Sequence, residues 1–195
     1  MDRLHALTRL ALLLALAACD ESAKSAPPPV SRFEAVKAKA PAADPLAELC
    51  DVRFEAGQGP ALALPVLDTA APEVGGSQWL NLWATWCKPC VEELPMIEKF
   101  RARMTSQGTP LRVHFVSVDA TAELVATFRT EHPGLPATSR VADAAAVAPY
   151  IQALGLDAGA GLPVHAFTGP DGKIRCVRSG AVVEKDLDAI AQLVK

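Results

Sequence analysis

Two apolar runs and several amphipathic segments follow one another in the chain after about residue 45. Residues 79–83 are almost all apolar, which is typical of a strand buried on both faces. The next segment repeats apolar residues at three- and four-residue steps and predicts a helix with one inward face, formed by Leu94, Ile97, Phe100 and Met104. Residues 111–118 predict a second buried strand, and residues 122–131 predict a second helix.

The remaining elements complete an α/β pattern. Asp143 is placed to cap a helical stretch that continues to residue 154. Residues 161–177 predict two strands joined by the turn Pro170-Asp171-Gly172, and residues 184–195 predict a last amphipathic helix. Residues 61–67 alternate and predict a strand with an edge proline at Pro65. Parallel strands joined by helices and closed by an antiparallel hairpin predict a three-layer α/β sandwich.

Two cysteines stand between the apolar strand and the first long helix. Cys87 is expected at the helix N-terminus, where unpaired backbone N–H groups and the helix dipole favour a thiolate. Lys88 adds a nearby positive charge, and Pro89 suits the first turn because it has no N–H to lose. Cys90 lies one turn further on and is placed to close a small disulfide ring. A bare pair with this spacing is also half of a zinc site, but the strand before it and the helix after it favour redox chemistry.

The stretch WATWCKPC (residues 83–90), followed by Glu93 and Pro95, resembles thioredoxin-fold oxidoreductases, and more narrowly the TlpA/ResA-like group of membrane-tethered reductases. Thioredoxin has a buried Asp in the strand before its cysteines, where this chain has Asn81. The TlpA/ResA-like group instead has a Glu three residues after the second cysteine, which Glu93 matches. The resemblance implies a thioredoxin-like domain over residues 45–195 with an N-terminal β-hairpin extension.

The same resemblance implies thiol–disulfide exchange. Cys87 would attack a substrate disulfide as a thiolate, and Cys90 would then attack Cys87 and release the reduced substrate. Glu93 is the candidate acceptor of the Cys90 proton, because a partly buried carboxyl has a raised pKa. The alternative for Glu93 is a solvated residue in the first helical turns. Trp86 is expected to shape the substrate-binding surface beside Cys87, whereas Trp83 is expected in the core.

Pro163 begins the first strand of the C-terminal hairpin, where thioredoxin folds place a cis-proline beside the redox cysteines. A cis bond would turn the backbone of Leu162 toward the active site, so that an extended substrate could pair with it like an added strand. The alternative is an ordinary trans proline at a strand edge.

The N-terminus reads as an export signal. Residues 1–18 have a basic start and a short apolar stretch, and Leu16-Ala17-Ala18-Cys19 resembles the lipobox of bacterial lipoproteins. Cys19 would then carry the lipid, and residues 19–44, rich in Ala, Pro, Lys and Ser, would form a disordered tether. A plain cleaved signal is the alternative. We therefore expect a protein tethered to the periplasmic side of a bacterial membrane, with Asp20 favouring the inner membrane.

Counting the five cysteines leaves two without a role once Cys19 and the Cys87/Cys90 pair are set aside. In an exported protein two leftover thiols are expected to pair, so we predict a structural disulfide between Cys50 and Cys176. Two buried free thiols are the alternative.

Charge and histidine spacing limit the partners. A net charge of -3 gives no electrostatic case for nucleic acid. The histidines lie at no metal-ligand spacing from the cysteines, so we expect no metal and no cofactor, and interpret His114, His132 and His165 as structural or surface residues. The expected partners are protein disulfides, a thiol-reducing membrane donor and the lipid bilayer. A disulfide reductase, as in cytochrome c maturation, is favoured; a disulfide oxidase and a copper chaperone are the alternatives.

Overall fold

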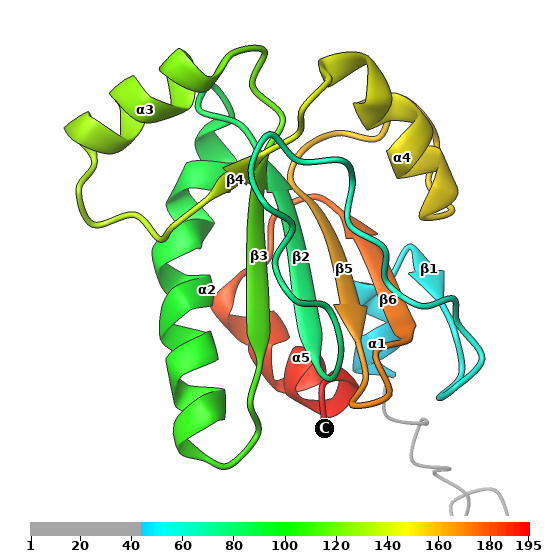
Figure 1. The fold of residues 1–195 in the computed structure, drawn as a ribbon. Helices are drawn as coiled ribbons and strands as arrows, with labels where there is room; N and C mark the ends of the chain where they lie inside the picture. Colours follow the sequence, from blue (N-terminus) through cyan, green and yellow to red (C-terminus); the bar gives the residue numbers. More distant parts are fainter. Residues whose placement is uncertain (1–43) are drawn as a thin grey trace, which may run out of the picture. The chain divides into compact units, whose positions relative to one another are not determined.

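A six-stranded mixed sheet forms the centre of residues 44–195, the part of the chain that the computed structural model describes (Figure 1). The strands are β1 (Val52–Arg53), β2 (Gln78–Trp83), β3 (Arg112–Ser117), β4 (Ser139–Arg140), β5 (Val164–Thr168) and β6 (Ile174–Ser179). Their order is β1-β6-β5-β2-β3-β4. β2, β3 and β4 are parallel, whereas β5, β6 and β1 each run antiparallel to their neighbours.

Helices pack on both faces of this sheet, so the predicted three-layer α/β sandwich is confirmed. One face is covered by α1 (Pro45–Leu49), α2 (Lys88–Ser106) and α5 (Leu187–Leu193), the last preceded by the 3₁₀ turn η2 (Glu184–Asp186). α3 (Ala122–Glu131) adds Phe128 to that side, with its ring 6.0 Å from that of Trp83. The other face is covered by α4 (Val147–Ala153), which follows the 3₁₀ turn η1 (Ala144–Ala146).

β2 is buried at every position, as its apolar sequence predicted. Trp79, Asn81 and Trp83 face the layer of α2 and α5, whereas Leu80 and Leu82 face the layer of α4. A strand that is buried on both faces must be apolar almost throughout. Asn81 is the exception in the strand interior, and it lies on the side of α2.

The predicted inward face of α2 is also confirmed. Cys87 is the N-cap residue of this helix, and Pro89 lies in its first turn. The buried residues of α2 are Cys90, Glu93, Leu94, Ile97, Phe100 and Met104. The apolar stripe therefore fixes which side of the helix faces the sheet, and it carries Cys90 and Glu93 to that side with it.

Within residues 44–195, the expected N-terminal β-hairpin is not formed. β1 pairs with β6, and residues 61–67 form only isolated bridges, from Ala61 to Lys173 and from Leu67 to Val141. Between these bridges the segment crosses the α4 face of the sheet, where Leu62, Leu64 and Leu67 join the apolar cluster. Its alternating pattern therefore reflects side chains that cover a sheet face, and not the pairing of a strand at an edge.

The predicted disulfide between Cys50 and Cys176 is present, and it joins the end of α1 to β6 across 126 positions of sequence. The predicted signal peptide and the predicted lipidation site Cys19 lie outside the described residues, as does the predicted tether except for Asp44. Asp44 belongs to the folded unit, because its side chain caps α1 and pairs with Arg53. No helix within residues 44–195 combines the length and the apolar character that a membrane crossing requires.

Candidate active site

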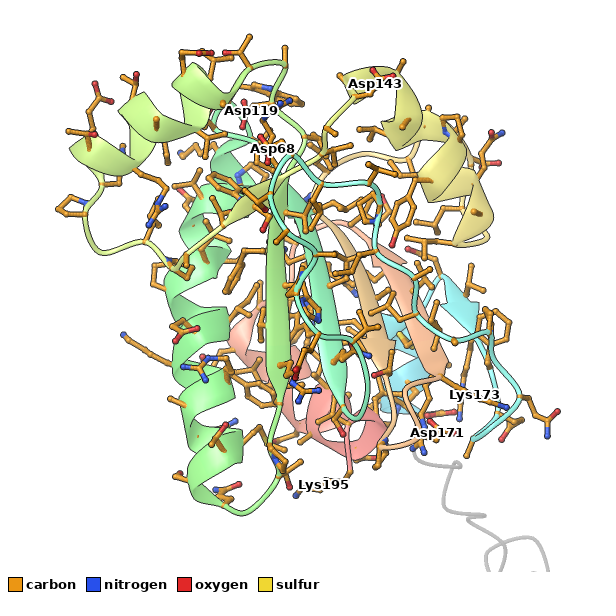
Figure 2. The ribbon with its side chains drawn as sticks, viewed as in Figure 1. Asp68, Asp119, Asp143, Asp171, Lys173 and Lys195 are labelled. Atoms are coloured by element: carbon orange, nitrogen blue, oxygen red, sulfur yellow. A yellow bond between two sulfur atoms is a disulfide. The ribbon has the colours of Figure 1, made fainter. Side chains whose placement is uncertain are left out.

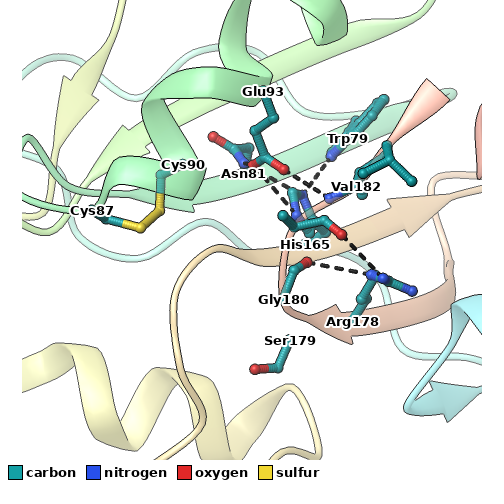
Figure 3. Close-up of polar contacts among 12 residues, drawn as sticks. Trp79, Asn81, Cys87, Cys90, Glu93, His165, Arg178, Ser179, Gly180 and Val182 are labelled. Carbon is teal, nitrogen blue, oxygen red and sulfur yellow. Dashed lines mark hydrogen bonds and ion pairs between the residues drawn. A yellow bond between two sulfur atoms is a disulfide. The ribbon is translucent and has the colours of Figure 1, made fainter.

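Cys87 and Cys90 form a disulfide at the N-terminus of α2 (Figure 3). Cys87 is 6% exposed, whereas Cys90 is fully buried. Of the two cysteines, only Cys87 therefore has any exposed surface, although less than the sequence suggested. After reduction, the N-terminal end of the helix dipole would favour the thiolate of Cys87. The exposed ammonium of Lys88 lies 3.6 Å from a carboxylate oxygen of Glu92.

Asp119 fixes the loop that leads to Cys87. It follows β3 and is almost fully buried, and Figure 2 shows it at the same end of the sheet as Asp68. Its carboxylate accepts hydrogen bonds from the backbone N–H of Thr85 at 3.0 Å, the Thr85 hydroxyl at 2.8 Å and the Ser117 hydroxyl at 2.6 Å. The sequence analysis did not single out Asp119, which directly follows the predicted strand of residues 111–118.

Trp86 is 71% exposed, next to Cys87 in sequence, whereas Trp83 is buried as predicted. A shallow depression lies beside Trp86, between the active-site loop and α3, and is lined by Thr85, Trp86, Glu123, Leu124, Thr127, Phe128 and Glu131. An exposed indole beside the reactive sulfur gives a partner an apolar surface on which to dock.

The peptide bond between Leu162 and Pro163 is cis, as the sequence predicted. Pro163 directly precedes β5, and Leu162 packs against the apolar cluster that contains both redox cysteines. The structure therefore places this turn against the same core as the disulfide.

Glu93 is buried beneath the second turn of α2, with 4% of its surface exposed, so the alternative of a solvated residue is excluded. Its Oε1 accepts a hydrogen bond from Asn81 Nδ2 at 2.8 Å, and its Oε2 accepts one from the backbone N–H of Val182 at 2.8 Å (Figure 3). Burial raises the pKa of Glu93 to about 7, although these two hydrogen bonds and the positive charge of Arg178 oppose the change. A carboxyl with this pKa can take up and release a proton near neutral pH.

His165 completes a buried polar group with Trp79, Asn81 and Glu93, which we call the Glu93 cluster. His165 is fully buried on β5, and its Nε2 lies 3.5 Å from Glu93 Oε1. Burial lowers the pKa of His165 to about 3, with the charge of Arg178 acting in the same direction, so the ring is neutral. The sequence analysis took His165 for a structural or surface residue and missed its contact with Glu93.

Arg178 anchors the loop that binds Glu93. Its guanidinium donates hydrogen bonds to the carbonyls of Leu49 at 3.1 Å, Gly180 at 3.3 Å and Ala181 at 3.0 Å. Val182, whose N–H binds Glu93, is the next residue after Ala181. The loop is thereby tied to α1, which the Cys50–Cys176 disulfide joins to β6.

Within residues 44–195, no group of three or more His, Cys, Asp or Glu side chains is arranged to hold a metal ion. The other two histidines of residues 44–195 lie away from the Glu93 cluster: His114 contacts Gln78 at 3.0 Å, and His132 stacks on Phe128.

No family model matches the chain. Among curated proteins, it is 28% identical over 128 residues to the thiol-disulfide oxidoreductase ResA of Bacillus subtilis, a match that spans 62% of this chain and 63% of that protein. It is also 39% identical over 49 residues to the thioredoxin-like protein YneN of the same organism, which covers 25% of this chain and 29% of that protein. The chain thus matches less than two thirds of the length of these relatives.

Solved structures with the same fold have low sequence identity. The thioredoxin domain of a thiol-disulfide oxidoreductase from Bacteroides vulgatus aligns with a TM-score of 0.54 and 17% identity, over 73% of this chain and 99% of that one. A thiol-disulfide isomerase from Corynebacterium glutamicum aligns with a TM-score of 0.55 and 17% identity, over 70% and 97%. The fold is therefore that of thioredoxin. In sequence, the chain is similar to a thiol-disulfide oxidoreductase, ResA, and to a thioredoxin-like protein, YneN.

Proposed function

We propose that this protein is a thiol–disulfide oxidoreductase that reduces disulfides of other proteins through Cys87 and Cys90. The proposal depends on one observation: a disulfide lies at the N-terminus of α2, and a buried carboxyl, that of Glu93, stands three residues after its second cysteine. The similarity to ResA is consistent with it.

The reaction begins with both cysteines reduced. The Cys87 thiolate attacks one sulfur of the substrate disulfide, and the other substrate sulfur leaves as a thiolate. Cys90 then transfers its thiol proton to the Glu93 carboxylate and attacks the Cys87 sulfur. The second substrate sulfur leaves, so two electrons have passed from the cysteine pair to the substrate.

Glu93 suits this proton transfer because it is buried on the same face of α2 as Cys90 and has a pKa close to neutrality. The same step in reverse would serve an oxidase, so the preference for reduction rests on the likeness to the ResA-like group. Trp86, Leu162 and Pro163 form the proposed substrate-binding surface around Cys87, with the backbone of Leu162 pairing with an extended substrate.

We propose that the protein acts outside the cytoplasm, held to the membrane by a lipid on Cys19 and supplied with electrons by a thiol-reducing membrane protein. Support comes from the signal-like and lipobox-like sequence of residues 1–19. A Cys19→Ser variant should move from the membrane fraction to the soluble fraction. Unchanged membrane association would contradict the lipid anchor.

A covalent trap tests the nucleophile. A Cys90→Ser variant should accumulate substrates linked to Cys87, because the resolving thiol is missing. A Cys87→Ser variant is the matched control and should capture few of them. Equal capture of the same proteins by both variants would contradict the assignment of Cys87.

Equilibration with glutathione tests the direction. A reductase is expected to have a potential well below about -180 mV, the value typical of protein disulfide isomerase. A more oxidising potential would favour the oxidase. In a single-turnover assay, Glu93→Gln should slow the resolving attack of Cys90 on the order of 10²-fold, because the base is lost.

A further inference from the structure

His165 is fully buried at the position of β5 that lies directly opposite Asn81 on β2. This register brings the imidazole ring to the α2 side of the sheet, next to the Glu93 carboxyl. A buried imidazole has two polar nitrogens, and each of them is stable only with a suitable partner. The identity of the partners therefore defines where the ring carries its proton.

The Nδ1 atom of His165 faces donors. Trp79 Nε1 lies 3.1 Å from it, and an indole N–H can only donate a hydrogen bond. Asn81 Nδ2 lies 3.3 Å from the same atom. Figure 3 shows the contact of the ring with Trp79. Since Nδ1 must accept, the neutral ring carries its proton on Nε2.

The Nε2–H group is thereby turned toward acceptors. Glu93 Oε1 lies 3.5 Å from Nε2, and no hydrogen bond of normal geometry satisfies Nε2 within the described residues. The Gly180 carbonyl also acts on the ring, since it raises the pKa of His165, and it accepts a hydrogen bond from Arg178. A negative charge on Glu93 would attract this N–H and shorten the contact.

We propose that His165 is a positioning residue for the proposed exchange reaction: its Nε2–H, oriented by Trp79, stabilises the ionised form of Glu93 and so keeps that carboxyl ready to accept the Cys90 proton. His165 remains neutral and neither gains nor loses a proton. This role rests on the proposed function of Glu93. The Nε2–H group acts from 3.5 Å, beside the hydrogen bonds that Glu93 accepts from Asn81 and Val182.

The charged and titratable groups around Glu93 support a neutral His165 and a Glu93 that takes up the proton. Arg178 on β6 is the cation that lowers the pKa of Glu93, and it also lowers that of His165. Asn81 on β2 and the Val182 N–H are neutral donors. If His165 took the proton instead, it would place a buried cation near Arg178 and would lose the acceptor for the Trp79 N–H.

Two amide variants distinguish the role of Nε2 from that of Nδ1. In His165→Gln the side-chain amide can place an N–H near the position of Nε2, whereas in His165→Asn it can offer an acceptor near Nδ1 and has no N–H that reaches Glu93. The readout is the titration of the Glu93 carboxyl in the reduced protein, followed by carbon-13 NMR and assigned with Glu93→Gln. This measurement does not require that the protein reduces anything.

The midpoint should be near 7 in the unmodified protein. It should rise by roughly one pH unit in His165→Asn, because one donor to the carboxylate is lost, and should return toward its original value in His165→Gln. The rate of the Cys90 step should then fall roughly fivefold at pH 7 in His165→Asn and recover at higher pH. An unchanged midpoint in a folded His165→Asn protein would overturn the proposal.

Nitrogen-15 NMR of the unmodified protein gives a test that needs no variant. We expect a neutral His165 ring with its proton on Nε2. A proton on Nδ1 would overturn the proposal even if neither variant folds. If the titration behaves as expected but the protein exchanges no disulfides, the proposed function is wrong and the proposed role of His165 stands. If the protein exchanges disulfides but the titration of Glu93 is the same in His165→Asn, the proposed role of His165 is wrong and the proposed function stands.

Discussion

Glu93 on α2 and Val182, which are 89 positions apart in sequence, are joined by a hydrogen bond of 2.8 Å from the Val182 backbone N–H to Glu93 Oε2. The Glu93 carboxyl lies on the α2 side of the sheet and has almost no contact with water. The fold thereby holds an ionisable group in a place where ionisation is costly. Its charge should consequently be visible in the stability of the protein.

The free energy of unfolding should fall with rising pH because of Glu93. Burial raises the pKa of Glu93 from 4.5 to about 7. The stabilising contribution of the protonated form is fully present below pH 4.5 and is lost as the pH rises through 7. The difference amounts to about 3 kcal/mol. Urea unfolding at pH 4.5 and pH 8.5 should show this slope, and it should be much smaller in Glu93→Gln; equal slopes would contradict the burial of an ionisable Glu93.

Removal of the Cys50–Cys176 disulfide should lower the free energy of unfolding. The bond closes a loop of 126 positions. In the chain-entropy model, a loop of that size corresponds to at most about 5 kcal/mol. Denaturant unfolding of the double variant Cys50→Ala/Cys176→Ala should show most of this loss.

The control for that experiment is the Cys87→Ala/Cys90→Ala variant, which removes a disulfide that closes only a short loop. It should lose less stability in the same model. If both double variants unfolded at the same denaturant concentration, the long-range disulfide would have no bracing role.

Asp119→Asn should disturb the loop before Cys87. The Asp119 carboxylate accepts three hydrogen bonds, from Thr85 and Ser117, and an amide cannot accept at both of its ends. We expect a loss of about 1–3 kcal/mol in stability and a change in the reactivity of Cys87 toward a thiol reagent.

Asp68→Asn is the matched control, since Asp68 pairs with Arg140 at 2.9 Å close to the same end of the sheet but does not contact the active-site loop (Figure 2). Because this pair is mostly buried, the variant should also cost about 1–3 kcal/mol, but it should leave the reactivity of Cys87 unchanged. Equal effects of the two variants on Cys87 would argue against a specific role for Asp119.

Trp86→Ala should separate substrate docking from chemistry. Because Trp86 is 71% exposed, its loss should change the free energy of unfolding by less than about 0.5 kcal/mol. Reduction of a protein disulfide should slow, whereas reduction of a small aromatic disulfide reagent should not. Equal slowing with both substrates would indicate that Trp86 acts on Cys87 itself.

Several features could be predicted from the sequence, and those around Cys87 depend only on residues close to one another in the chain. The apolar strand, the following helix and the position of Cys87 at its N-terminus all follow from local periodicity and capping. The cis bond at Pro163 was predicted from the resemblance and its place before the hairpin, and the Cys50–Cys176 bond from counting cysteines.

The predicted N-terminal hairpin was wrong for a reason that the pattern alone could not reveal. Residues 61–67 alternate in polarity, and this alternation is the same whether a segment pairs at a sheet edge or crosses a sheet face. The bridge at Ala61 lies beside β6 and the bridge at Leu67 lies beside β4, toward opposite edges of the sheet. The segment between them therefore crosses one face of the sheet and covers it.

The sequence by itself determined the reactive pair, the helix that carries it and the position of Glu93 one turn beyond Cys90, because these are set by spacing along one element. Only the tertiary structure decided what Glu93 meets. The pairing of β2 with β5 places His165 opposite Asn81, and the loop after β6 brings Val182 to α2. These contacts bring together groups that are 12 to 101 positions apart in the chain. Side-chain periodicity predicts which face of a single helix or strand is buried. The pKa of Glu93 depends on groups from several elements, which only the tertiary structure brings together.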